Sequence, residues 1–190
     1  MRHLPSRARV YEREADALLS LANQQTVQLD ERGRISFPQQ FRTRLGDELF
    51  ISPDDRERGF LVIRSEEGYN NNIEAIRAER RAKGDTPEEV EDCVRDFTMW
   101  TAPVSPDKNG RLTIPKELKE YAGLDTRENV PKEERGRAVF VGLGDHAEIW
   151  EESRLRAYTE RRRAERRIQR ARDDAEHNAK FTGGSNEEQK

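Results

Sequence analysis

Polar and apolar residues alternate in two short segments of this chain, residues 26–29 and 34–37. Alternation with a period of two residues is typical of strands that have one buried face. The turn between the segments contains Gly33, which can adopt a positive φ without strain. The pattern therefore predicts a β-hairpin.

The spacing of apolar residues then changes to that of a helix. Phe41 and Leu45 lie four residues apart, so they share one face of a helix predicted over residues 38–46, which has a proline at its first position and a glycine at its end. Residues 48–52 and 60–64 are apolar segments on either side of a charged turn. They predict two further strands.

The same order of elements returns in the second half of the chain. Residues 111–114 predict a strand, residues 115–123 a helix, and residues 138–141 and 147–150 two more strands. We expect each half to have the order strand, strand, helix, strand, strand. The second half also has a long charged insert, residues 125–137, which we expect to form an exposed loop.

Helices are predicted between and after these two units. The first covers residues 66–80, and the second begins with a capping box formed by Thr86 and Glu89. A third helix is predicted over residues 153–172. The apolar faces of the first two helices consist of Tyr69, Ile73 and Ile76, and of Val90, Val94 and Phe97.

These elements divide the chain into five predicted parts. The parts are an N-terminal extension (1–22) with a short helix at 11–21, a first unit with its trailing helix (23–80), a linking helix (81–100), a second unit with its trailing Arg-rich helix (101–172), and a disordered tail (173–190). The tail is expected to be disordered because its end is acidic and contains Gly and Ser.

Two turns of the same design lie at equivalent places in the two halves. Their sequences are Asp30-Glu31-Arg32-Gly33-Arg34 and Asp107-Lys108-Asn109-Gly110-Arg111, and each is followed by an alternating segment that ends in proline. The offset between the two glycines is 77 residues (110 − 33), and the two prolines have the same offset. A fixed offset indicates an internal duplication.

The basic residues of these turns have two interpretations. In the first, Arg32, Arg34, Lys108 and Arg111 contact DNA through phosphates or guanine. In the second, Asp30 pairs with Arg34 and Asp107 pairs with Arg111, so that ion pairs hold each turn in shape. The two can coexist. Arg32 and Lys108, at the turn tips, are the favoured direct DNA contacts.

Three further turn residues are assigned mainly to turn geometry. Gly33 and Gly110 supply positive φ angles. Asn109 could donate or accept a hydrogen bond at a base edge, but Asn before Gly more often serves the geometry of a turn.

Composition limits the class of protein. Hydrophobic residues make up 33% of the 190 residues and charged residues 38%, so each half can bury only a small core and oligomerisation would add buried surface. No apolar stretch approaches the roughly 20 residues that span a bilayer, so we expect a cytoplasmic protein. One Cys and three His offer no disulfide and no metal-ligand set, and no cofactor or small-molecule substrate is expected.

The net charge of −3 hides a strong asymmetry. Between residues 154 and 172 nine arginines stand against two acids, a charge of +7 (9 − 2), which leaves −10 (−3 − 7) for the remainder. This segment is either an additional DNA clamp or a solvated helix face with Leu155, Tyr158 and Ile168 packed inward. We favour the solvated face. The nine are Arg154, Arg156, Arg161, Arg162, Arg163, Arg166, Arg167, Arg170 and Arg172.

Four other residues attract attention by their chemistry. His146, beside Asp145, suggests a hydrolase, but no nucleophile motif or phosphate loop accompanies it, so we expect a turn or interface residue and no enzyme. Trp100 and Trp150 are expected to anchor the core or a subunit interface. Cys93 is expected to be buried and inert.

The two turn motifs resemble the paired Asp-x-x-x-Arg motifs of the MraZ family of bacterial transcription regulators. The segment from Val141 to Trp150, with Gly-Asp-His at residues 144–146 and Ile-Trp at its end, resembles the same family. The resemblance covers residues 21–158. It depends on the two motifs and this segment occurring together.

The resemblance implies an α+β fold of two tandem AbrB-like swapped-hairpin β-barrel units. It also implies a homo-oligomeric ring that binds short direct repeats in double-stranded DNA, upstream of genes for cell division and cell-wall synthesis. We therefore expect a sequence-specific regulator, a repressor, associated with the nucleoid. The same module occurs in antitoxins, so the alternative is a protein-interaction scaffold that uses the Arg-rich extension.

Overall fold

The computed structural model of the chain describes residues 24–54, 58–124 and 136–183, with side chains described as far as residue 175. The helix expected at 11–21, most of the insert at 125–137 and the last seven residues lie outside the described part. The chain forms two compact units, which divide between Glu152 and Ser153.

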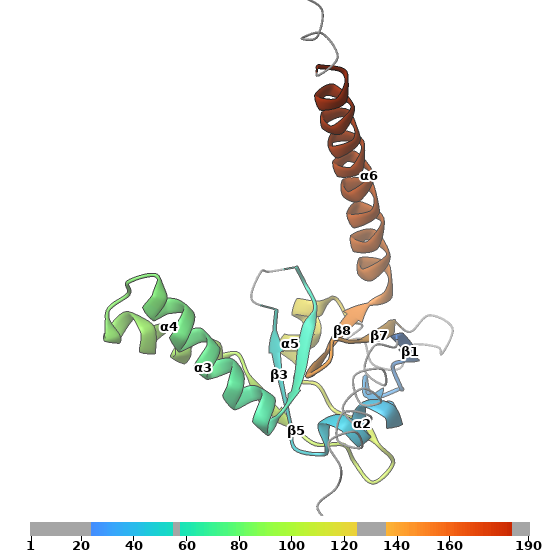
Figure 1. Cartoon of the computed structure of the whole chain (residues 1–190). Coiled ribbons are helices and arrows are strands. Elements are labelled where there is room, and N and C mark those ends of the chain that lie inside the picture. The colour runs from blue at the N-terminus through green and yellow to red at the C-terminus, as the bar shows by residue number, and fades with distance from the viewer. Residues whose placement is uncertain (1–23, 55–57, 125–135, 184–190) are drawn as a thin grey trace, which may run out of the picture. The chain divides into compact units, whose positions relative to one another are not determined.

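The strands of the compact unit that ends at Glu152 form one antiparallel sheet and one short ribbon (Figure 1). The ribbon pairs β2 (Ile35–Ser36) with β6 (Arg111–Leu112). A mixed α and β composition with mostly antiparallel pairing agrees with the expected α+β class. The order of the sheet is β1 (Gln24–Gln28), β7 (Arg137–Gly142), β8 (His146–Glu151), β4 (Leu61–Ser65), β3 (Leu49–Pro53) and β5 (Ala102–Val104).

The expected hairpin of residues 26–37 is formed only at its turn. A single bridge joins Leu29 to Ile35, whereas β1 forms its ladder with β7, and β2 pairs with β6. Long-range pairing prevails because β2 has only two residues, while β7 offers a longer partner whose Ala138 and Phe140 are fully buried. Strands from the two halves of the sequence are therefore interleaved in one sheet.

The short helices follow the prediction closely. Helix α2 (Gln39–Leu45) ends at Gly46, whose φ is 81°, and α5 (Lys116–Ala122) ends at Gly123, whose φ is 67°. Both helices direct apolar residues into the core shared with the sheet, among them Phe41, Leu45 and Leu118. Phe41 and Phe140 lie with ring centroids 5.5 Å apart, so α2 is attached to the strand that pairs with β1.

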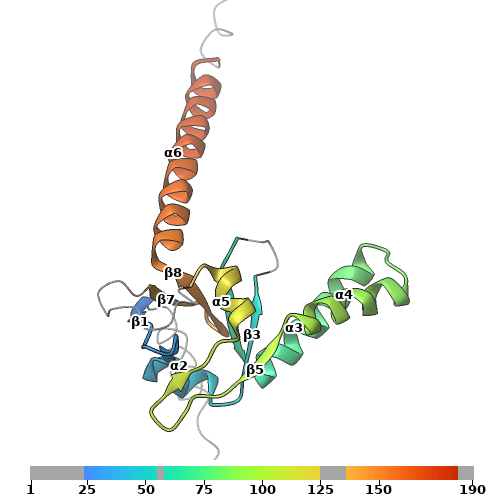
Figure 2. The ribbon, with the colours of Figure 1, turned by 180° about the vertical axis from the view of Figure 1, so that it is seen from behind.

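Helices α3 (Glu66–Ala82) and α4 (Pro87–Met99) lie side by side (Figures 1 and 2). The predicted capping box at Thr86 and Glu89 is present. Tyr69 stacks on Phe50 of β3 at 4.4 Å and lies 5.8 Å from Phe97 of α4. The aromatic cluster of Phe50, Tyr69 and Phe97 thus packs α3 and α4 against the sheet.

Three expectations about burial need correction. Trp150 is buried against Phe60, but Trp100 is 62% exposed, so it is not part of the core, and its role at a subunit interface stays a prediction. Cys93 is only half-buried, because its position on α4 borders a hollow rather than the core. Ile168 is 56% exposed and does not pack inward.

Helix α6 (Glu152–Gly183) is longer than the helix predicted over residues 153–172. It continues through residues 173–183, for which we expected disorder. The side chains of residues 160–175 are all exposed. Within the described ranges, no helix combines the length and apolarity needed to cross a bilayer.

Candidate nucleic-acid interface

The two turns, which lie 77 residues apart in the sequence, meet in space. The ribbon of β2 and β6 pairs Ile35 with Leu112, which are both buried, and the backbone N–H of Phe37 donates to the carbonyl of Gly110 at 2.8 Å. Two apolar side chains thus fix the register of the pair, and the turns lie at its two ends.

Each turn is organised by its aspartate. Asp30 Oδ1 accepts hydrogen bonds from the backbone N–H groups of Arg32 and Arg34, both at 2.9 Å. Asp107 Oδ1 accepts from those of Asn109 and Arg111, at 2.8 and 2.9 Å. These contacts are Asx-type turns, which explain why a carboxylate opens each motif. The glycine of each turn has a positive φ, 66° at Gly33 and 72° at Gly110.

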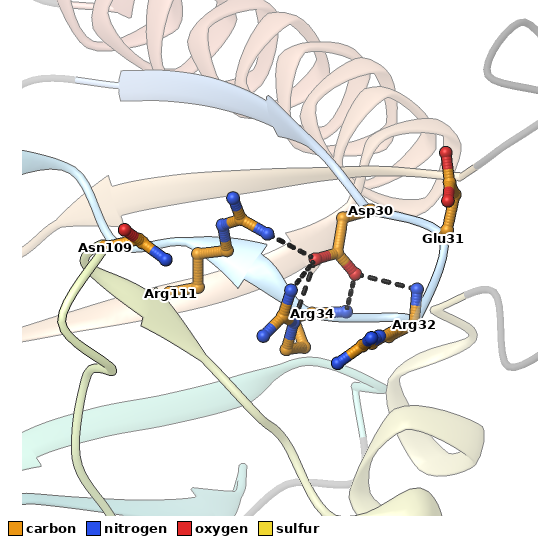
Figure 3. Close-up of a pocket in the computed structure, with 6 residues that line it drawn as sticks. All are labelled: Asp30, Glu31, Arg32, Arg34, Asn109 and Arg111. Carbon is orange, nitrogen blue, oxygen red and sulfur yellow. Dashed lines mark hydrogen bonds and ion pairs between the residues drawn. The ribbon is translucent and has the colours of Figure 1, made fainter.

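The arginines cross between the turns, and Figure 3 shows Arg111 reaching Asp30. Arg34 pairs with Asp30 of its own turn at 2.8 Å, and its Nη1 donates to Asp107 Oδ2 at 3.2 Å. Arg111 Nη1 donates to Asp30 Oδ2, also at 3.2 Å. The expected ion pair of Asp30 with Arg34 is thus present, whereas the Arg111 side chain pairs with the other turn and meets Asp107 through its backbone.

Hydrogen bonding keeps both aspartates ionised. Desolvation raises the pKa of Asp30, but the hydrogen bonds from Arg34 and Arg32 outweigh it and lower the pKa from 3.8 to about 2. The backbone N–H of Arg111 is the main cause of the lowered pKa of Asp107. The charged network is therefore intact at neutral pH.

The remaining turn residues face solvent. Arg32, Lys108 and Asn109 are exposed, as is Glu31. A hollow of about 450 Å³ lies between the turns, and Figure 3 shows the side chains around it. The lining residues are Asp30, Glu31, Arg32, Arg34, Asn109 and Arg111. The structure thus brings together the predicted site residues from both motifs, with Lys108 exposed beside Asn109.

Comparison with known proteins shows which family the chain resembles over most of its length. The family model described as "MraZ protein, putative antitoxin-like" matches residues 97–177. A transcriptional regulator MraZ from Paenarthrobacter aurescens is 34% identical over 137 residues, which are 72% of this chain and 84% of that protein. Proteins of the same name from Kocuria rhizophila (31% identical, 72% and 84%) and Frankia alni (33%, 71% and 83%) are similar over comparable lengths.

The chain belongs to the MraZ family. The resemblance seen in the two motifs is thereby confirmed. The MraZ family model covers the second turn and α6 as far as residue 177.

Two neighbours of the turn pair were missed by sequence reasoning. Lys119 of α5 donates from Nζ to the carbonyl of Gly33 at 3.4 Å, and a methyl group at Gly110 would lie 3.8 Å from Nη1 of Arg42 on α2. Each short helix thus lies near the turn of the other half. Helix α5 lies near the turn of residues 30–34, and α2 near the turn of residues 107–111. No nearby sequence pattern points to Lys119 or Arg42. The equal offset of the two motifs does imply that the two turns occupy equivalent positions in the two halves.

Asp54 is another residue that the pattern did not single out. Its side chain is fully buried and accepts hydrogen bonds from the backbone N–H of Gly59 at 3.0 Å and from the Tyr121 hydroxyl at 2.9 Å. It therefore ties the end of β3 to α5.

His146 does not lie within a turn but begins β8, with Nδ1 2.6 Å from Asp145 Oδ1. It pairs across the sheet with Arg64. No group of three metal-binding side chains occurs among the described residues.

Proposed function

We propose that this protein is a sequence-specific DNA-binding transcriptional regulator that acts as a repressor. The names of its curated relatives support a role in transcription. The observation that carries the proposal is the reciprocal pairing of Asp30 with Arg111 and of Asp107 with Arg34, which braces two turns whose tips are exposed. A braced pair of turns contacts a duplex with little loss of conformational entropy.

Different turn residues make different contacts with DNA in this proposal. Arg32 and Lys108 bind phosphates, and Asn109 contacts a base edge. Arg34, whose side chain is 20% exposed, and Arg111, which is 38% exposed, hold the turns through the aspartates and add charge-assisted contacts to DNA. Asp30, Gly33, Asp107 and Gly110 set the turn shape.

Several protomers then act together. We propose that the halves form AbrB-like swapped-hairpin units and that the chains assemble into a ring. Such a ring places successive turn pairs on short direct repeats, so that weak contacts multiply into useful affinity. We also propose that the chain has the five parts predicted from its sequence.

The proposed targets are the ones implied by the resemblance of the two turn motifs. We propose promoters of cell-division and cell-wall genes, with the protein in the cytoplasm and bound to the nucleoid. Genome-wide mapping of binding sites tests this, and sites without a repeated short motif would contradict it.

A binding assay tests the turn assignment. In Arg32→Ala/Lys108→Ala, binding to a repeat-containing promoter fragment at about 0.15 M salt should fall at least about tenfold, because two phosphate contacts are lost per protomer. The control is Arg81→Ala/Lys83→Ala, which removes two positive charges at the far end of α3. Equal binding by both variants would contradict the assignment.

Arg34→Ala/Arg111→Ala should abolish binding and leave the oligomer intact. Its unfolding should be measured beside its binding, since both arginines also brace the turns. Retained affinity at about 0.15 M salt would contradict their role.

The family description supports a second candidate, an antitoxin-like scaffold that uses the Arg-rich extension to hold a partner protein. Deleting the residues after Glu152 distinguishes the two functions. If DNA binding survives and a co-purifying protein is lost, the extension is an interaction arm.

A further inference from the structure

The turn pair carries little net positive charge. Its four cations, Arg32, Arg34, Lys108 and Arg111, are offset by three acids, Asp30, Glu31 and Asp107, which leaves +1 (4 − 3). The chain without residues 154–172 carries −10. A body of that charge repels the phosphates that its turns must approach. The attraction needed for DNA binding must therefore come from elsewhere in the chain.

Helix α6 holds the concentrated positive charge. At 3.6 residues per turn, five of its arginines fall within an arc of about 100°, and they extend over about 21 Å of helix axis. We call them the basic face. It consists of Arg156, Arg163, Arg166, Arg167 and Arg170, and neither acid of residues 154–172 falls inside its arc.

The arginines of the basic face are exposed and unpaired among the described residues, although Asp174 lies within the same arc, one turn beyond Arg170. All five side chains are exposed, and no ion pair joins any of them to another side chain in the described part of the chain. Arg162, outside the arc, does pair with Glu165 at 2.8 Å. Arg163 and Arg167, and Arg166 and Arg170, are like charges four residues apart, which destabilises an isolated helix. A polyanion relieves this repulsion.

We propose that the basic face of α6 is a second DNA-binding element that binds the phosphate backbone without reading sequence. This inference rests on the proposed function of the turns. Arginine forms bidentate hydrogen bonds with phosphate, and five in a row suit a regular series of phosphates. Because α6 is covalently joined to the turns, its contacts raise the affinity of the turns for any duplex it binds.

Other ligands fit the face less well. A protein interface usually contains buried aromatic or aliphatic anchors, and the basic face has none. A helix that inserts into a membrane surface needs a broad apolar side. The side of α6 that carries Ala157, Ala164, Ile168 and Ala171 has a single large apolar residue.

Salt-dependent DNA binding by the full-length protein tests this proposal. The test variant is Arg163→Gln/Arg166→Gln/Arg170→Gln, on the basic face. The control is Arg154→Gln/Arg161→Gln/Arg172→Gln, which removes the same charge from another side of α6. Gln keeps helix propensity high, and circular dichroism checks that both variants stay helical.

We expect the basic-face variant to lower the slope of log affinity against log salt by about 2 to 3, because up to three phosphate contacts are lost. Its affinity for a 30-base-pair duplex of arbitrary sequence should fall at least about tenfold at 0.1 M salt. Its preference for the repeat-containing fragment over that duplex should be unchanged. The control variant should lower the slope by less than half as much.

Two outcomes would overturn the proposal. They are equal losses in the two variants and unchanged DNA binding by the basic-face variant. If unchanged DNA binding is accompanied by loss of a co-purifying protein or of binding to phosphatidylglycerol vesicles, the basic face binds that partner instead of DNA. The same experiment distinguishes a failure of the proposed turn function from a failure of the α6 proposal. If no fragment is preferred over another while binding still depends on the basic face, the proposed function fails and the role of α6 stands.

Discussion

At the scale of single residues, the centre of the site is a carboxylate rather than an arginine. Asp30 accepts hydrogen bonds from two backbone N–H groups of its own turn and from arginines of both turns. Asp107 likewise accepts from two backbone N–H groups of its own turn, but the only side chain that donates to it among the described residues is Arg34 of the other turn. The motif Asp-x-x-x-Arg is thus a structural unit first, and the two residues that follow each aspartate are exposed for contact.

Asp30→Asn tests this role. The pKa of Asp30 is about 2 in the folded chain and 3.8 ordinarily, so its charge stabilises the fold above about pH 4 and that stabilisation disappears as pH falls through about 2. The variant should lose about 1 kcal/mol at pH 7, a modest value because solvent screens partly exposed charges.

Denaturant unfolding at several pH values measures the effect. The difference between the variant and the native chain should narrow as pH falls from 4 toward 2. Glu31→Gln, an exposed charge removal at the next position, is the control. A difference that stayed constant over that range would show that the charge of Asp30 is not what stabilises the turns.

At the scale of elements, the local signals were reliable. Both short helices end at the predicted glycines, and α4 begins with the predicted capping box. Such features depend on residues within a few positions of one another, so the sequence displays them directly. The length of α6 was underestimated, since the acidic and polar residues after Arg172 continue the helix without an apolar stripe to mark it.

Thr86→Ala should lower the stability of the first unit by about 1 kcal/mol. The Thr86 hydroxyl accepts from the backbone N–H of Glu89, and the backbone N–H of Thr86 donates to the Glu89 carboxylate at 2.8 Å. Thermal unfolding measures the change. Thr86→Ser keeps the hydroxyl and should remain close to the native chain, and equal losses in both variants would argue against the cap.

At the scale of the whole molecule, the chain order and the sheet order differ. Strand β1 of the first half lies beside β7 of the second, and β3 pairs with both β4 and β5. The compact unit that ends at Glu152 therefore has one core, to which both halves of the sequence contribute. Helix α6, by contrast, belongs to a unit of its own.

Separating the halves tests this interleaving. Fragments 24–100 and 101–190 should each fail to fold as monomers, because β1 and β5 lose their partner strands and buried residues such as Ile35 and Leu112 lose each other. Mixing them should restore the sheet, as followed by circular dichroism and gel filtration. Cooperative unfolding of either fragment as a monomer would contradict the interleaved core.

The sequence by itself determined most of the elements, the duplication and the residues of both turns, because alternation, capping and glycine turns act over a few residues. It missed β5 and the end of α6. It left open whether the arginines pair within a turn. Only the tertiary structure decided that Arg111 reaches Asp30 and that β1 joins β7, since these pairings depend on burying Ile35, Leu112 and Phe140 in a common core. Contacts between distant segments depend on the shape of the whole core, and no single segment encodes that shape.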